Sequence, residues 1–193
     1  MTRYRTIVAD PPWRYTQDPG TLRARRGQQP RGRGRQAEDH YETMTTEQIA
    51  AMPVSQMVED NAHLYLWVTN PLLTDQRPDI KGRLTAPDIC RAWGFEPKSL
   101  VTWIKPGIGP GWYFRGATEH FIFAVRGNLP IPPANRERNV FEGPRGSHSA
   151  KPDCFYDMVE RVSPEPWAEL FARRARFGWE YPVGDQALGG AAV

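Results

Sequence analysis

The chain has only two cysteines among its 193 residues and no long apolar run. Cys90 and Cys154 stand far apart, so they form neither a zinc-binding pair nor a disulfide framework, and we interpret both as ordinary, partly buried thiols. The four histidines are equally scattered, which argues against a metal site. No segment approaches the ~18 consecutive apolar residues of a spanning helix, so we expect no association with membranes.

The amino-terminal residues do not resemble a secretory signal. Residues 1–8 are too few and too charged, and a strand-like run follows at once. We therefore expect a cytoplasmic protein. Its length suits a single domain, and hydrophobic residues make up 39% of the chain, which is enough for a core.

Positive charge is concentrated in one segment, although the formal net charge is only +3. Residues 14–40 are rich in Arg, Gly, Gln and Pro, and six arginines crowd residues 23–35. So few apolar residues cannot form a packed core, and we expect a long flexible loop. It is either a solvated loop or an arm that contacts nucleic-acid phosphates. Residues 187–193 are expected to be a disordered tail.

Strand-like and helix-like segments alternate along the chain. The expected strands cover residues 5–9, 63–69, 99–104, 121–125, 167–171 and 178–183. Helices are expected after the capping residues Thr45 and Thr85, the second ending at Gly94, and over Asp153–Val162. This alternation predicts an α/β fold with a largely parallel sheet, in which ligands bind beyond the carboxyl ends of strands.

The tetrapeptide Asp10-Pro11-Pro12-Trp13 follows the first expected strand. Two prolines cannot continue a central strand, so the chain must turn there. One interpretation is a simple turn with Trp13 in the core. The other is a site for the exocyclic amino group of adenine, in which the Asp10 carboxylate and the Pro11 carbonyl accept its two N–H bonds and Trp13 stacks on the base. Such acceptors favour a tetrahedral nitrogen and stabilise its developing positive charge, so no strong general base is required.

Further segments follow in order along nearly the whole chain. They are Tyr41-Glu42-Thr43-Met44, Leu64–Thr69, Trp93-Gly94-Phe95, Trp103-Ile104-Lys105, Glu119-His120, Val125–Asn128, His148–Asp153, Glu169–Arg173 and Gly184-Asp185-Gln186. Together with the tetrapeptide, this series resembles the MT-A70 family of S-adenosylmethionine-dependent N6-adenine methyltransferases. The resemblance implies a Rossmann-like class I methyltransferase fold with three α/β/α layers. The order would be circularly permuted, with the catalytic strand first and the cofactor strand last in one domain over residues 1–186.

The resemblance also implies roles for individual residues. Asp10, Pro11, Pro12 and Trp13 would be the catalytic residues. The residues that would bind the cofactor are Asp10, Lys151 at its carboxylate end, Phe171 and Arg173 beside its adenosine part, and Asp185 and Gln186 at its ribose or adenine. Without the resemblance, Lys151 would be a solvated residue at a helix entry, Phe171 a core residue and Arg173 a surface charge.

The expected substrate contacts are Trp13, Tyr15, Trp112, Arg115 and Glu119. Gly109–Arg115 is rich in glycine and aromatic residues and carries a positive charge. It is either a loop that grips a flipped nucleotide or a structural loop. Glu119 is expected to face the target base.

The chain departs from the better-known eukaryotic members after Arg173. Those members carry His-Asn and a longer loop, whereas this chain reads Arg174-Ala175-Arg176-Phe177-Gly178-Trp179. The ribose contacts of that loop therefore do not carry over. Asp185 also replaces an amide, which changes its hydrogen-bonding chemistry.

The expected activity is methyl transfer from S-adenosylmethionine to the N6 amino group of adenine in nucleic acid. DNA is favoured over RNA because compact, arginine-rich members look bacterial or viral, and a homodimer or a partner subunit is a further expectation. One alternative is a catalytically inactive, nucleic-acid-binding partner subunit, against which the intact tetrapeptide argues. A second alternative is an RNA adenine methyltransferase. A third is a methyltransferase that acts on cytosine or on a protein glutamine amide, but those related families typically carry Ser or Asn in place of Asp10.

Overall fold

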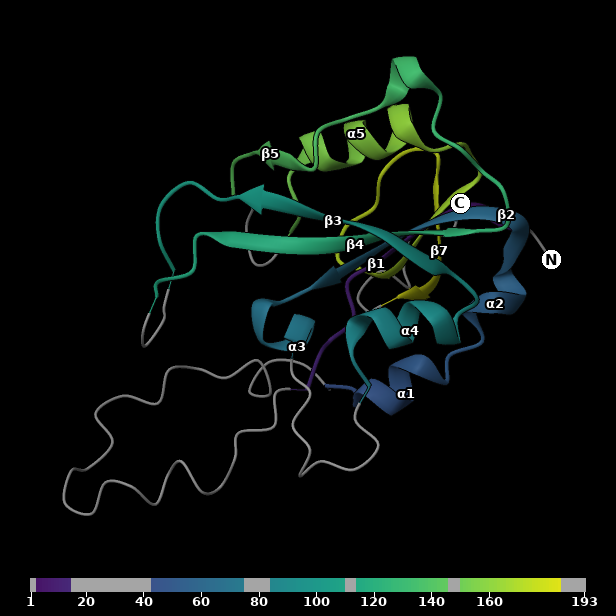
Figure 1. Cartoon of the computed structure of the whole chain (residues 1–193), viewed down its shortest axis with the longest axis horizontal. Coiled ribbons are helices and arrows are strands. Elements are labelled where there is room, and N and C mark those ends of the chain that lie inside the picture. The colour runs from purple at the N-terminus through teal and green to yellow at the C-terminus, as the bar shows by residue number, and fades with distance from the viewer. Residues whose placement is uncertain (1–2, 15–42, 75–83, 110–113, 146–149, 185–193) are drawn as a thin grey trace.

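The computed structural model describes residues 3–14, 43–74, 84–109, 114–145 and 150–184 (Figure 1). Most of the expected arginine-rich loop and the expected tail lie outside these residues. The strands are β1 (Tyr4–Ala9), β2 (Val58–Val68), β3 (Glu96–Ile104), β4 (Thr118–Arg126), β5 (Val140–Glu142), β6 (Trp167–Ala172) and β7 (Trp179–Gly184). The helices are α1 (Thr46–Ala50), α2 (Val54–Met57), α3 (Asn70–Thr74), α4 (Ala86–Ala92) and α5 (Asp153–Val162), with a 3-10 turn, η2, at Pro133–Asn135.

The seven strands form one mixed sheet in the order β5-β3-β4-β2-β1-β6-β7. β1 lies parallel to both β2 and β6, β6 lies parallel to β7, and β5 lies parallel to β3. β4 runs antiparallel to its neighbours β2 and β3. Four of the six pairings are parallel, so the described sheet is largely parallel as predicted, with β4 as its antiparallel strand. β3 and β4 follow each other along the chain, and the described residues between them contain no crossover helix that would return the chain to a parallel start.

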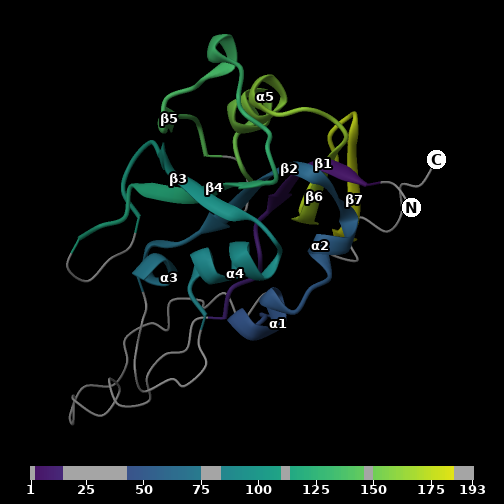
Figure 2. The same cartoon turned by 45° about the vertical axis from the view of Figure 1, so that its right-hand side comes forward.

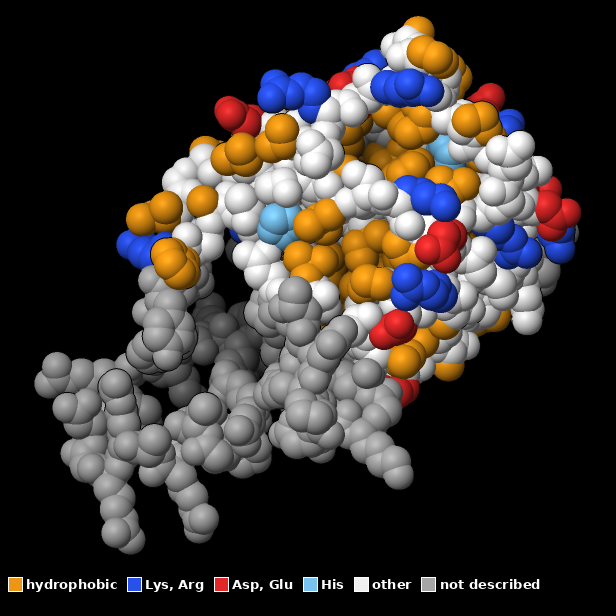
Figure 3. Space-filling model, in the orientation of Figure 1, with side chains coloured by type: hydrophobic (Ala, Val, Ile, Leu, Met, Phe, Trp, Pro, Cys, Tyr) orange, Lys and Arg blue, Asp and Glu red, His pale blue; other side chains and the backbone are white. Residues whose placement is uncertain are grey.

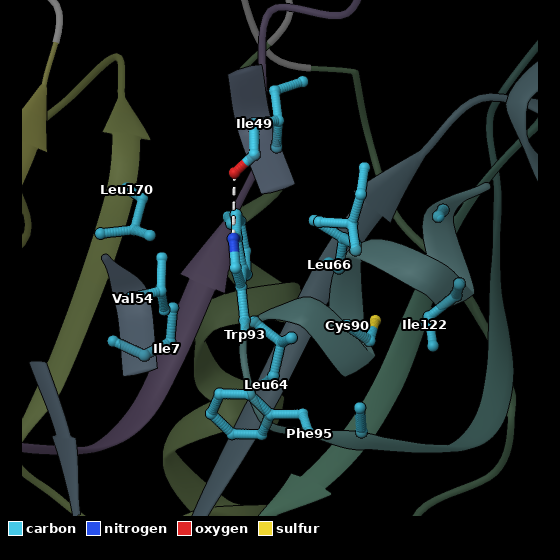
Figure 4. Close-up of a cluster of buried hydrophobic side chains, with 14 of the residues drawn as sticks. Ile7, Ile49, Val54, Leu64, Leu66, Cys90, Trp93, Phe95, Ile122 and Leu170 are labelled. Carbon is cyan, nitrogen blue, oxygen red and sulfur yellow. Dashed lines mark hydrogen bonds between the residues drawn. The ribbon is translucent and has the colours of Figure 1, made fainter. Parts of the chain in front are cut away.

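Helices cover both faces of the sheet (Figures 1 and 2). On one face, α1, α2 and α4 pack Ile49, Val54 and Ile89 into one hydrophobic cluster. On the other, α5 packs its apolar stripe, including Phe155, into a second cluster. The indole N–H of Trp93 donates to the carbonyl of Ile49 at 3.0 Å, which fixes the end of α4 against α1 (Figure 4). The architecture is that of a mixed α/β protein, consistent with a Rossmann-like methyltransferase fold.

Local sequence signals account for the helix boundaries. Thr45 and Thr85 each accept a hydrogen bond from the backbone of the third helical residue, and the side chain of that residue bonds back, so both helices open with a capping box. Gly94 has φ +85°, a left-handed conformation that glycine adopts without a Cβ penalty and that ends α4 as predicted. Asp153–Val162 is helical over the predicted range.

Large apolar side chains are open to solvent beside the hairpin of β3 and β4. Leu100 and Ile104 on β3 are partly exposed, and Ile108 and Phe114 in the loop after it are more so. Figure 3 shows apolar side chains gathered in patches on the visible face of the molecule. None of the described helices is long and apolar enough to cross a membrane.

Candidate active site

Charged side chains meet at one edge of the sheet. Asp10 follows the carboxyl end of β1, and Lys105 follows that of β3. Glu119 stands at the start of β4, which belongs to the same edge because β4 runs antiparallel to β2 and β3. Lys151 lies just before α5. The carboxyl ends of strands are where α/β sheets bind ligands, so this edge is the candidate active site.

A continuous chain of ion pairs joins these four side chains. The Lys151 ammonium lies 2.8 Å from Asp10 Oδ2 and 3.2 Å from Glu119 Oε2. Lys105 donates to Glu119 Oε1 at 2.9 Å. Lys151 also lies 4.4 Å from the centroid of the Trp67 ring, a cation–π contact. The four charges are two positive and two negative, so the chain of ion pairs is neutral.

Burial makes this arrangement electrostatically strong. Only 8% of Lys151 is exposed. Burial lowers the pKa of its ammonium, but the carboxylates of Asp10 and Glu119 outweigh that effect, and the pKa is raised. Burial likewise raises the pKa of Glu119, yet Lys151 and Lys105 bring the net shift below its usual range. Lys151 and Glu119 are therefore both charged at neutral pH.

Backbone hydrogen bonds hold the Asp10–Trp13 turn. The N–H of Trp13 donates to the Pro11 carbonyl at 2.8 Å, and the N–H of Met44 donates to the Pro12 carbonyl at 2.8 Å. An isolated bridge pairs Trp13 with Met44. The Pro11 carbonyl keeps a second lone pair, so it can still accept another hydrogen bond. The turn is held in place before any ligand binds.

The ring of Trp13 lies in the core. It is 5% exposed and belongs to the cluster under α1 and α4, and its indole N–H donates to the Trp67 carbonyl at 3.2 Å. The suggested stacking of Trp13 on a base does not match this placement. Burying a large ring and satisfying its N–H stabilises the turn, which explains why the core interpretation fits this residue.

Glu169 is a buried carboxyl that the residue patterns did not single out. It lies on β6, is 5% exposed, and accepts a hydrogen bond from the Tyr156 hydroxyl at 3.0 Å. Burial raises its pKa to about 7, the Tyr156 hydrogen bond lowers it, and the nearby Asp10 charge raises it. The signal that could have found it is a charged residue within the otherwise apolar strand sequence Trp167–Ala172.

The remaining candidate residues are found at the carboxyl end of β6, in the loop before β4, or outside the described residues. Phe171, the last residue but one of β6, has φ +65°, an unusual conformation for a residue with a Cβ, and packs against the core. Arg173 is exposed just after β6. Arg115 is exposed in the loop before β4, where its Nε donates to the Gly109 carbonyl at 3.0 Å. Four candidates lie outside the described residues: Tyr15, Trp112, Asp185 and Gln186.

The cysteines and histidines form no metal-binding arrangement in the described part of the chain. No group of three or more His, Cys, Asp or Glu side chains is placed there to hold an ion. Cys90 is buried and Cys154 is partly buried, and both thiols are free. His63 is buried and bonded through both ring nitrogens, to the Ser163 hydroxyl and the Leu129 carbonyl, each at 2.7 Å.

The family model for MT-A70 matches residues 4–186, nearly the whole chain. The chain belongs to the MT-A70 family. This is a family of S-adenosylmethionine-dependent methyltransferases. The match runs from β1 through the Asp10 turn, Lys151 and the β6 segment, so every part of the candidate site lies within it.

Relatives of this MT-A70 chain include enzymes of different lengths. The Type II methyltransferase M.MunI of Mycoplasma is 28% identical over 190 residues, which cover 92% of this chain and 76% of that protein. The human N(6)-adenosine-methyltransferase catalytic subunit METTL3 is 24% identical over 182 residues, 90% of this chain but 26% of that protein. A probable N(6)-adenosine-methyltransferase of rice is 25% identical over 200 residues, 98% of this chain and 24% of that protein. The chain thus spans about a quarter of these two eukaryotic relatives.

The loop after β6 in this MT-A70 chain is fixed by arginines to α5. Arg176 donates to Glu160 at 2.7 and 2.9 Å and to Asp157 at 2.6 Å. Arg174 donates to Asp153 at 2.6 Å, and both arginines stack over the Tyr156 ring. These two arginine side chains therefore hold the loop against α5.

Proposed function

We propose that this chain transfers a methyl group from S-adenosylmethionine to the N6 amino group of adenine in nucleic acid. The observation that carries the proposal is the Lys151–Asp10 ion pair at the carboxyl edge of the sheet, in a turn that backbone hydrogen bonds hold. Membership of the MT-A70 family and the names of its relatives support the same chemistry. When bound, the cofactor supplies an electrophilic methyl group on a sulfonium centre.

The chemistry of the side chains fits this cofactor. Its amino acid end carries an ammonium and a carboxylate, for which Asp10 and Lys151 offer opposite charges 2.8 Å apart. Phe171 offers an aromatic face for an adenosine group, and Arg173 stands two residues further along the chain. The assignment of Asp185 and Gln186 to the ribose or adenine rests on the family resemblance. Along the chain, these groups follow β1 or β7, lie in or just after β6, or precede α5.

On the substrate side, Asp10 and Pro11 accept the two N–H bonds of the adenine amino group. Both acceptors sit in a turn that is already held by hydrogen bonds, so no reorganisation is needed when charge develops on the nitrogen. Glu119 adds a negative charge on the same side. The proton on the methylated nitrogen is acidic and leaves to water. Tyr15, Trp112 and Arg115 are proposed to contact the nucleotide from the neighbouring loops.

We infer a circularly permuted order for the domain, which would extend over residues 1–186. The catalytic turn follows the first strand, and the cofactor segment follows β6, yet β1 and β6 are neighbours in the sheet. The carboxyl ends of these two strands lie at the same edge, although β1 ends at Ala9 and β6 begins at Trp167. This supports an order in which the cofactor strand comes late in the sequence.

DNA is the favoured nucleic acid. The compact, arginine-rich character of the chain supports this choice, as does its match over 76% of the Type II methyltransferase M.MunI. The eukaryotic relatives, named for adenosine, are matched over only about a quarter of their length. A homodimer or a partner subunit is proposed to add binding surface, because little of this compact chain remains free to recognise a sequence.

The decisive experiment incubates the protein with isotopically labelled donor and either duplex DNA, single-stranded DNA or RNA, followed by digestion and identification of the nucleosides. The proposal expects label in N6-methyladenine, more from DNA than from RNA. Label in a cytosine or in protein would overturn it. Nucleic-acid binding without donor binding would instead favour the inactive partner subunit.

A further inference from the structure

Glu169 lies on the same face of the sheet as the ion-paired group. It stands opposite Val8 in the parallel ladder of β1 and β6. Successive side chains of a strand alternate between faces, so Glu169 shares the α5 side with Val8 and with Asp10, two residues further on. Its carboxyl interacts electrostatically with both Asp10 and Lys151. It therefore lies beside the proposed cofactor site.

Among the described residues at this edge, the hydrogen-bond donor to Glu169 is the neutral Tyr156 hydroxyl rather than a lysine. Lys105 and Lys151 are already balanced by Asp10 and Glu119. The titratable and charged groups that face Glu169 are Asp10 after β1, Lys151 before α5, Tyr156 on α5, Arg174 after β6 and Tyr181 on β7. Their balance and its burial bring the pKa of Glu169 to about 7. At neutral pH the carboxyl is therefore poised between its two protonation states.

The methyl donor and its product differ by one unit of charge. In S-adenosylmethionine the ammonium and the carboxylate cancel, and the sulfonium leaves a net charge of +1. In S-adenosylhomocysteine the sulfur is a neutral thioether, so the net charge is zero. A buried carboxyl beside the site is stabilised in its ionised form by the first ligand but not by the second.

We propose that Glu169 is a specificity-determining residue that distinguishes the charged methyl donor from its neutral product. The inference rests on the proposed function. When the donor binds, Glu169 gives its proton to solvent, and the new carboxylate balances the sulfonium charge. When the product binds, the carboxyl keeps its proton. No covalent bond to either ligand changes in this exchange.

Because donor binding releases a proton from Glu169, the affinity for the donor depends on pH. Donor binding tightens as pH rises through about 7, because less work is then needed to ionise Glu169. The affinity for the product does not rise with pH in this way, because the neutral product does not stabilise the ionised carboxyl. Above neutral pH, Glu169 thereby favours replacement of the spent product by fresh donor.

The test is isothermal titration calorimetry of donor and product at pH 7, repeated in two buffers with different ionisation enthalpies, which yields the number of protons released. The donor is expected to release up to about half a proton more per site than the product, because a group of pKa about 7 is half protonated at pH 7. Glu169→Gln keeps the side-chain size and should remove this difference. Glu137→Gln makes the same charge change at the Arg161 pair on the other end of α5 and should leave it intact.

A second variant keeps the carboxyl and shifts its titration. Tyr156→Phe removes the hydrogen bond that lowers the pKa of Glu169, so the pH at which donor affinity rises should move upward. Equal proton release by donor and product in the unmodified protein would overturn the inference, whatever the variants do. If neither ligand binds, the proposed function fails as well, and the two failures are thus distinguishable.

Discussion

Lys151 is a buried cation held between two carboxylates, and this position determines the effect of removing it. Without its ammonium, Asp10 would lose its paired cation and Glu119 would keep only Lys105, which disfavours the charge of both carboxylates. Lys151→Ala should weaken donor binding about tenfold or more, a loss of about 1.4 kcal/mol, while nucleic-acid binding changes little. Calorimetric titration with the donor and a filter-binding assay with DNA measure the two effects. Unchanged donor affinity would reduce Lys151 to a structural lysine.

The burial of Glu169 leads to a prediction about how the free energy of unfolding depends on pH, which can be tested without a ligand. Its folded pKa of about 7 lies above the unfolded value of 4.5, so the folded state holds the proton more tightly. This contribution to stability is fully present below pH 4.5 and is lost as pH rises through 7. Relative to Glu169→Gln, the unmodified protein should therefore lose about 2 kcal/mol of unfolding free energy between pH 5 and pH 8. Urea denaturation of both proteins at the two pH values measures it. Parallel pH profiles would show that the carboxyl is not held neutral by burial.

At the scale of elements, the loop between β6 and β7 depends on its attachment to α5. Arg176 bonds Glu160 through two nitrogens, and the indole of Trp179 donates to the same carboxylate at 2.8 Å. Arg176→Ala should cost about 1 kcal/mol of stability, because this arginine is only 24% exposed and its contacts are bidentate. Donor affinity should fall several-fold, since Arg173 lies in the same loop.

Arg161→Ala is the matched control for that change. Arg161 also bonds a glutamate through two nitrogens, at 3.2 and 2.8 Å, but it is more exposed and lies at the far end of α5. Its loss should leave donor affinity unchanged. Thermal denaturation and donor titration of both variants provide the comparison. Equal effects of the two variants on donor affinity would exclude a role for the β6–β7 loop in the site.

Elements with strong local signals could be predicted from the sequence. Two capping threonines, the glycine after α4 and the amphipathic stripe of α5 each act over a few residues, and each gave the correct element. β5 was missed because Val140–Glu142 is too short to show alternation, and its pairing with β3 is a tertiary contact. The antiparallel placement of β4 is likewise set by the connection to β3 rather than by residue types.

The candidate site could be predicted from the sequence only where its functional residues are adjacent in the chain. The Asp10 turn stood out because two prolines must end a strand. The ion pairs of Lys105, Glu119 and Lys151 join residues from three separate parts of the sequence, so no local sequence pattern predicts them. For Trp13 the sequence left two roles open, because an aromatic side chain can stack on a base or pack in the core. Only its burial in the structure decides between these roles.

For the whole molecule, the positive charge of the arginines in residues 23–35 leads to a prediction about the salt dependence of DNA binding. Arginine contacts to phosphates release counterions, with a log–log salt slope of about −0.9 per phosphate neutralised on duplex DNA. Replacing Arg23, Arg25, Arg26, Arg31, Arg33 and Arg35 by Gln should flatten this slope and raise the apparent Michaelis constant for DNA. Donor affinity should hardly change. Binding measured from low to high salt tests the prediction, and an unchanged slope would direct attention to Arg115 instead.

In the proposed mechanism, Asp10, held by Lys151, accepts a hydrogen bond from the adenine amino group and stabilises the charge that develops there. Single-turnover methyl transfer to DNA by Asp10→Ala tests it most directly. Asp60→Ala serves as the control, because Asp60 is exposed near the amino end of β2, at the opposite edge of the sheet. Circular dichroism checks that both variants fold. We expect a rate about 100-fold or more below that of the unmodified protein for Asp10→Ala and a normal rate for Asp60→Ala. Near-normal transfer by folded Asp10→Ala would contradict it.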